Sequence, residues 1–194
     1  MISAKFGHLL DKPLSPLVRR FNLSPNSLTL TGFLITVAAA VAIPRHLIVG
    51  GLLIILGGLF DILDGIVARI KGKETEFGAF LDSVLDRFSD AAIFLAIGWR
   101  MYLLDNITGA ALSMITLTGA LLISYTRARA EGIGKKCSTG LMERTERIVL
   151  IAFGCLADLL TPILWLLAIL TFYTVVQRIF HVWKETRQPT MLEK

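Results

Sequence analysis

The sequence has few charged residues and few cysteines. Only 18% of its 194 residues are Asp, Glu, Lys or Arg, whereas 54% are hydrophobic and the mean hydropathy is +0.67. Soluble globular domains carry about 25% charged residues, so we expect one integral membrane domain over residues 1–194. The two cysteines, Cys137 and Cys155, form neither a CxxC pair nor a metal-binding set, and we expect no disulfide between them.

The N-terminus lacks the basic, apolar and small-residue order of a cleavable signal peptide, so we expect the first apolar helix to remain in the protein. Internal repeats and low-complexity segments are also missing from the sequence. The net charge of +5 favours anionic lipid headgroups or phosphate substrates as partners, and we expect no binding of nucleic acid.

Six apolar blocks are each close to the ~20 residues that cross a bilayer as a helix. They cover residues 26–43, 47–70, 77–99, 107–127, 141–157 and 162–182. Charge, glycine and proline concentrate in the breaks between them. The sequence therefore predicts an all-α integral membrane protein with six transmembrane helices, bundled over residues 26–184.

An amphipathic segment precedes the first block, over residues 1–22. Its apolar residues recur at near-helical spacing, and Lys5, Lys12 and Arg19 repeat every seventh residue on the other side. We expect an interfacial helix on an anionic membrane surface, broken or kinked at Pro13 and Pro16. A soluble amphipathic cap on the bundle is the alternative interpretation.

The distribution of basic residues predicts the orientation in the cell membrane. If the N-terminus lies inside, seventeen of the twenty Lys and Arg lie at the inner ends of the spans, and only Arg45 and Arg100 lie at the outer ends. This bias satisfies the positive-inside rule. We therefore expect both termini and the active site to be cytoplasmic.

Four aspartates lie within this apolar sequence. Asp61 and Asp64 are spaced i,i+3 near the end of one block, and Asp82 and Asp86 are spaced i,i+4 near the start of the next, so each pair shares a helix face. A turn around Gly72 would fold the two faces together. Four converging carboxylates repel one another unless cations neutralise them, and hard divalent ions prefer oxygen ligands. The spacing predicts a two-metal site.

Salt bridges from these aspartates to Arg69 and Arg87 at the helix ends are the alternative, but acidic residues within a membrane are too costly for that to be the default. The complete pattern is D-x2-D-G-x2-A-R-x8-G-x3-D-x3-D, from Asp61 to Asp86. It resembles the signature of the CDP-alcohol phosphotransferases, and every position of that signature is filled.

This resemblance implies a role for each matched position. Asp61, Asp64 and Asp82 would bind two divalent cations, Mg²⁺ or Mn²⁺, and Asp86 would be the general base and a ligand of the second cation. The remaining matches imply contact with the CDP-lipid by Gly65, Arg69, Gly78, Asn26 and Thr29. Close helix crossings would also select the glycines, and helix capping would also explain Asn26 and Thr29.

The second half of the chain is similar to the inositol-phosphate branch of this family. The matching segments are 124–131, 143–147, 177–178 and 182–183. An acceptor that already carries a phosphate needs a cationic pocket, and Arg127, Arg144 and Arg178 would clamp that phosphate from three helix ends. Contacts with lipid headgroups are the alternative for these arginines. Two departures weaken the acceptor assignment: related enzymes often have Lys at Arg127 and Pro at Thr145.

The expected reaction couples CDP-diacylglycerol or CDP-archaeol to inositol phosphate and releases CMP. Glycerol 3-phosphate would need the same clamp and is the alternative acceptor. A cation transporter is the alternative from another class, although transport gives no reason for the Asp64-Gly65 and Ala68-Arg69 pairs. The resemblance also implies a homodimer.

Overall fold

The computed structural model describes residues 24–187, and the predicted interfacial helix over 1–22 lies outside this range. Within it the chain forms six helices and no strands, which confirms the all-α prediction. The helices are α2 (Pro25–Ala42), α3 (Leu47–Lys71), α4 (Glu76–Leu103), α5 (Ile107–Glu131), α6 (Arg144–Leu156) and α7 (Leu160–Arg187).

Helices α2, α3, α5 and α7 are long and apolar enough to cross a membrane, so the protein is a multi-pass membrane protein. Helix α4 has 28 residues, but it carries five charged residues between its first residue and Asp90, namely Glu76, Asp82, Asp86, Arg87 and Asp90. Helix α6 has only 13 residues and begins at Arg144. It is shorter than the span predicted over 141–157, and a full crossing by α4 or α6 stays a prediction.

The irregular segment 132–143 explains the late start of α6. Three hydrogen bonds attach it to α7: Thr174 Oγ1 accepts from the Met142 amide at 3.1 Å, Arg178 Nε donates to the Thr139 carbonyl at 2.9 Å, and His181 Nε2 lies 3.2 Å from the Lys136 carbonyl oxygen. Non-helical backbone is tolerated at membrane depth only where its polar groups find such partners. Tertiary contacts with α7 therefore replace the first turn predicted for α6.

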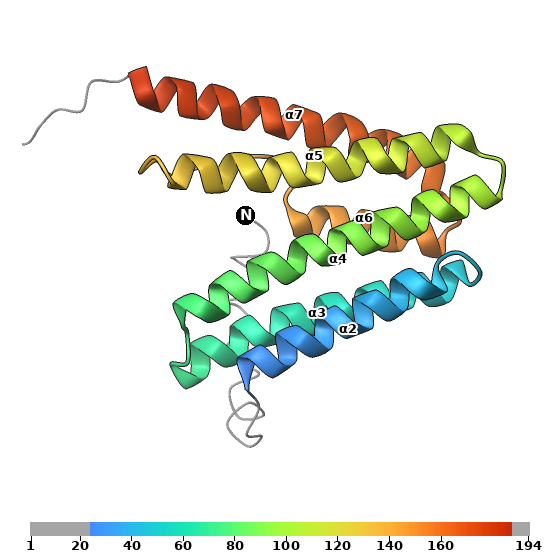
Figure 1. Ribbon diagram of the computed structural model, residues 1–194, viewed down its shortest axis with the longest axis horizontal. Helices are drawn as coiled ribbons and strands as arrows, with labels where there is room; N and C mark the ends of the chain where they lie inside the picture. The colour runs from blue at the N-terminus through green and yellow to red at the C-terminus, as the bar shows by residue number, and fades with distance from the viewer. Residues whose placement is uncertain (1–23, 188–194) are drawn as a thin grey trace, which may run out of the picture.

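The helices form two groups, with α2, α3 and the start of α4 on one side and α5 and α7 on the other (Figure 1). Helix α6 contacts both α3 and α7. Helices α2 and α3 approach closely at Gly57, where a Cβ atom would lie 2.6 Å from Thr36 Oγ1 and 3.2 Å from the Gly32 carbonyl oxygen. Small residues at helix crossings in membranes allow this approach.

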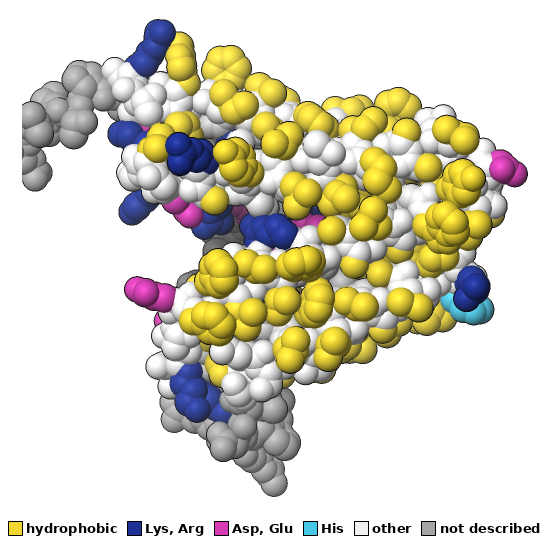
Figure 2. All heavy atoms as spheres, viewed as in Figure 1, with side chains coloured by type: hydrophobic (Ala, Val, Ile, Leu, Met, Phe, Trp, Pro, Cys, Tyr) yellow, Lys and Arg dark blue, Asp and Glu magenta, His cyan; other side chains and the backbone are white. Residues whose placement is uncertain are grey.

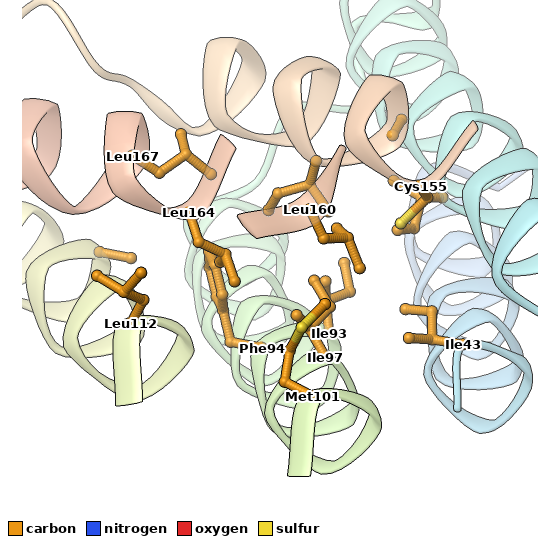
Figure 3. Packing of buried hydrophobic residues seen from close by; sticks show 14 of the residues in the cluster. Ile43, Ile93, Phe94, Ile97, Met101, Leu112, Cys155, Leu160, Leu164 and Leu167 are labelled. Atoms are coloured by element: carbon orange, nitrogen blue, oxygen red, sulfur yellow. The ribbon is translucent and has the colours of Figure 1, made fainter. Parts of the chain in front are cut away.

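The hydrophobic core gathers at the end of the bundle where α4 turns into α5 (Figure 3). Ile93, Phe94 and Ile97 of α4 are fully buried there, against Leu164 and Leu167 of α7 among others. Close packing at this end leaves the two helix groups free to diverge at the other. Figure 2 shows basic and acidic side chains gathered in a hollow at that opposite end.

Candidate active site

The hairpin between α3 and α4 places the four aspartates at the open end of the bundle. Helix α3 ends at Lys71, and the next residue, Gly72, has φ 59° and ψ 31° and so takes the left-handed conformation that glycine adopts without strain. Helix α4 begins after Thr75, whose Oγ1 accepts a hydrogen bond from the Gly78 amide at 3.0 Å. The predicted turn around Gly72 is thus confirmed.

Three of the four aspartates, Asp61, Asp64 and Asp82, meet in one cluster. One carboxylate oxygen from each of Asp61, Asp64 and Asp82 lies within 4.8 Å of the other two. Asp64 Oδ2 and Asp82 Oδ1 are buried and have no hydrogen-bond partner among the described residues. A buried carboxylate oxygen without a partner is costly, and three convergent carboxylates are the donor set that hard divalent cations prefer. The cluster therefore fits a divalent cation.

Arg144, at the first turn of α6, supplies positive charge to the same cluster. Its Nη1 lies 2.8 Å from Asp61 Oδ2 and 2.8 Å from Asp86 Oδ1. One guanidinium nitrogen of Arg144 thus bridges a carboxylate of α3 and a carboxylate of α4. Asp86 has a second, longer contact, since Arg87 Nη1 lies 3.7 Å from its Oδ2.

A cavity of about 740 Å³ opens beside these residues, between α3, α4, α5, α6 and α7. Its volume lies within the range of small-molecule sites, roughly 300–1,000 Å³. The charged residues on its wall are Asp61, Asp64, Arg69, Asp82, Asp86, Arg87, Asp90, Arg127, Glu131, Glu143, Arg144, Arg147 and Arg178. A polar cavity of this kind suits a charged substrate better than an apolar one.

The three arginines predicted to hold the acceptor phosphate all line this cavity. Each has a protein partner as well. Arg127 Nε lies 2.9 Å from Glu131 Oε1, Arg144 bridges two aspartates, and Arg178 donates to the carbonyls of Thr139 and Ile123. The three arginines therefore line one cavity, and a phosphate bound there would compete with these partners.

The predicted nucleotide contacts divide into two sets. Gly65 and Arg69 line the cavity, and a Cβ atom on Gly65 would lie 3.3 Å from Arg69 Nη1. Asn26, Thr29 and Gly78 are not among the residues that line this cavity. Thr29 Oγ1 donates to the Pro25 carbonyl oxygen at 3.1 Å within α2, and a Cβ atom on Gly78 would lie 2.9 Å from Thr75 Oγ1 and 3.3 Å from Asn26 Oδ1. These contacts favour roles in capping and helix packing for the second set.

A buried ion pair in the cavity wall was not predicted from the sequence. Arg147 of α6 pairs with Asp90 of α4, and their side chains are only 2% and 3% exposed. Arg147 Nε and Nη1 and Asp90 Oδ1 have no partner within the described part of the chain. Asp90 follows Asp86 by four residues, so it lies on the same face of α4. This spacing could have predicted that Asp90 lies beside the other aspartates.

Comparisons with known proteins agree with this site. The family model of the CDP-alcohol phosphatidyltransferases matches residues 22–182. The chain is 37% identical to the archaetidylinositol phosphate synthase of Methanothermobacter thermautotrophicus, covering 94% of this chain and 95% of that one. It is 38% identical to the phosphatidylinositol phosphate synthase of Corynebacterium glutamicum, covering 90% and 84%.

Solved structures of the phosphatidylinositol phosphate synthase of Mycobacterium tuberculosis are also similar. The structure with CDP-DAG bound has a TM-score of 0.81 and 32% identity, over 95% of this chain and 97% of that one. The complex with manganese and citrate has a TM-score of 0.82 at the same identity, over 95% and 92%. Those ligands belong to that protein.

Proposed function

This chain belongs to the CDP-alcohol phosphatidyltransferase family, and on that premise we propose that it transfers the lipid phosphate of a CDP-lipid to inositol phosphate, releasing CMP. The observation that carries the proposal is the single cavity that joins the aspartate cluster to the three arginines. The residues that would activate one phosphate and those that would hold a second one line the same cavity. The archaetidylinositol and phosphatidylinositol phosphate synthases among its relatives support this acceptor.

In the proposed reaction Asp86 removes the proton of an acceptor hydroxyl. The hydroxyl oxygen forms a bond to the lipid-linked phosphorus of the CDP-lipid, and the bond from that phosphorus to the CMP oxygen breaks. A direct displacement needs no covalent intermediate. The carboxylate of Asp86 faces the cavity from α4, and Arg144 and Arg87 hold it in place.

Asp61, Asp64, Asp82 and Asp86 would hold two divalent cations, Mg²⁺ or Mn²⁺. When bound, such ions neutralise the pyrophosphate and polarise the phosphorus that is attacked. Gly65 and Arg69 would contact the nucleotide, since both line the cavity beside Asp64. Thr29, a neighbour of Asp64, would act through that carboxylate.

The acceptor phosphate would be held by Arg127, Arg144 and Arg178. Their guanidinium groups suit a phosphate because they offer paired donors in a fixed geometry. Glycerol 3-phosphate carries the same group and is the alternative acceptor, and the donor lipid would contain either diacylglycerol or archaeol. Serine and free inositol have no phosphate for the arginines to hold.

The whole chain would form one domain with six membrane-spanning helices. In this arrangement both termini and the cavity face the cytoplasm, because the open ends of α3, α5 and α7 carry the excess of basic residues, including Arg69, Lys71, Arg129 and Lys184. The expected assembly is a homodimer, which only the family resemblance supports.

A panel of acceptors tests the proposed function. Purified protein in detergent is mixed with Mn²⁺ and either CDP-diacylglycerol or CDP-archaeol, and CMP release is followed with inositol phosphate, glycerol 3-phosphate, free inositol or serine. We expect rapid CMP release with inositol phosphate. Equal rates with free inositol or serine would contradict the phosphate clamp. Cation flux in proteoliposomes without CMP release would instead favour a transporter.

A further inference from the structure

We propose that Arg144 is a resident counter-ion of the aspartate cluster, and that the second divalent cation must displace it before the acceptor binds. The inference rests on the proposed function and concerns how the same site is regulated. The consequence is an order of binding. The divalent cations bind first, Arg144 is released from the aspartates, and Arg144 then binds the acceptor phosphate.

The contacts of Arg144 carry the first step. Its Nη1 is shared equally between Asp61 Oδ2 and Asp86 Oδ1, at 2.8 Å from each. Asp61 and Asp86 are both proposed to hold divalent cations, so Arg144 contacts two carboxylate oxygens that those cations would need. The side chain is only 23% exposed, so solvent screens this attraction weakly.

The other aspartates indicate where the first cation binds. Asp64 Oδ2 and Asp82 Oδ1 are buried and have no partner among the described residues. A cation bound to these two oxygens would break no hydrogen bond within the described residues. Any cation that recruits Asp86 must compete with Arg144 at Oδ1, or approach Oδ2, which lies 3.7 Å from Arg87 Nη1. We therefore expect one cation to bind without displacing an arginine, and a second cation to bind only in competition with one.

The residues that line the cavity indicate what Arg144 would bind after its release from the aspartates. Arg144 lines the same cavity as Arg127, Arg147 and Arg178, and its own Nε has no partner among the described residues. Glu131 and Asp90 in this lining are already paired with Arg127 and Arg147, so a released Arg144 would need another anion. The phosphate of the acceptor would supply it, so cation binding and acceptor binding would strengthen each other.

Titration with Mn²⁺ alone tests the competition. The full chain, purified in detergent and stripped of metal with a chelator, is titrated with Mn²⁺ while the electron paramagnetic resonance signal of free Mn²⁺ is recorded. For the unaltered chain we expect a tight and a weak class of site. In Arg144→Gln the weak class should tighten roughly tenfold, which is within the usual range for coupled sites. Arg144→Lys, which keeps the charge, should leave it weak.

Arg127→Gln is the matched control, because it removes the same charge from the same cavity wall but its partner is Glu131 and not an aspartate of the cluster. We expect it to leave both classes of Mn²⁺ site unchanged. The proposal is overturned if Arg144→Gln leaves the Mn²⁺ affinity of the weak sites unchanged or lowers it. Arg144 would then be a structural link between α3 and α4 that the cations do not displace.

The unaltered chain supplies a second measurement in case Arg144→Gln does not fold. Binding of inositol phosphate is measured by calorimetry with and without saturating Mn²⁺, and Mn²⁺ binding is measured with and without inositol phosphate. We expect the same factor of about five or more in both directions, because coupling between sites is reciprocal. A factor of one overturns the proposal. None of these titrations requires turnover, so failure of the proposed reaction would appear separately, as absence of CMP release.

Discussion

The close crossing of α2 and α3 provides a stringent test of the architecture that positions the aspartates. Gly57 and Gly58 are neighbours in α3, and the change from Gly to Ala adds the same methyl group at each. At Gly57 the new Cβ atom would lie 2.6 Å from Thr36 Oγ1 and 3.2 Å from the Gly32 carbonyl oxygen, whereas at Gly58 its nearest neighbour would be Ile148 Cγ2 at 3.9 Å.

Both variants gain the higher helix propensity of alanine, but only one of them introduces a steric clash. Alanine is favoured over glycine in a helix by about 1 kcal/mol, and both variants gain it. Overpacking costs about 1–3 kcal/mol, and only Gly57→Ala incurs it, because Thr36 Oγ1 cannot rotate away without leaving its 3.0 Å hydrogen bond to the Gly32 carbonyl. We therefore expect Gly57→Ala to be less stable than Gly58→Ala by about 1–3 kcal/mol.

Thermal unfolding in detergent, followed by tryptophan fluorescence, measures this difference. At roughly 2–4 °C for each kcal/mol in a chain of this size, the Tm of Gly57→Ala should lie about 2–12 °C below that of Gly58→Ala. Combining Gly57→Ala with Thr36→Ala removes the nearest clashing atom and should recover part of the loss. Equal Tm values for the two single variants would refute the close crossing.

Four further predictions concern the site and the topology. Asp61→Asn or Asp82→Asn should abolish turnover and weaken metal-dependent binding of the CDP-lipid, and near-normal CMP release in either would contradict the two-cation site. Asp86→Asn should lower kcat by about 10²-fold or more, as for loss of a general base, with a smaller effect on CDP-lipid binding; an equal loss of binding would make Asp86 mainly a ligand. Arg127→Ala should raise the acceptor KM roughly tenfold, because a charge-assisted hydrogen bond contributes about 1.5–3 kcal/mol, whereas Arg127→Lys should keep most activity and the KM for the CDP-lipid should change little. Tags at both termini should react only with cytoplasmic probes, and an external C-terminus would mean that the count of six spans is wrong.

Local patterns in the sequence were sufficient to predict the helices and the aspartate hairpin. The i,i+3 and i,i+4 spacings place each pair of aspartates on one helix face, and Gly72 marks the turn between them. Both features depend on neighbours within one or two helical turns, so they can be deduced without knowledge of the fold.

Contacts between distant parts of the chain could not be predicted in this way. The bond from Arg144 to Asp61 joins residues 83 positions apart, and the pair of Arg147 and Asp90 joins residues 57 positions apart. The late start of α6 has the same origin, since Leu141 and Met142 continue an apolar block in sequence but the Met142 amide bonds to Thr174 instead. Tertiary hydrogen bonding overrode the local apolar pattern there.

The short length of α6 bears on the depth of the site, if α6 stands upright in the membrane as we propose. Its 13 residues rise about 20 Å as an α-helix, whereas the hydrocarbon layer is about 30 Å thick. With Leu156 at one boundary of that layer, Arg144 would lie about 10 Å below the other boundary. A lipid phosphate normally rests at the headgroup level, so the donor would have to sink by nearly two helical turns, or the bilayer would have to thin around α6. In that arrangement membrane thickness controls access of the donor, and we expect the rate to fall in bilayers of longer lipids even when the enzyme itself is unchanged.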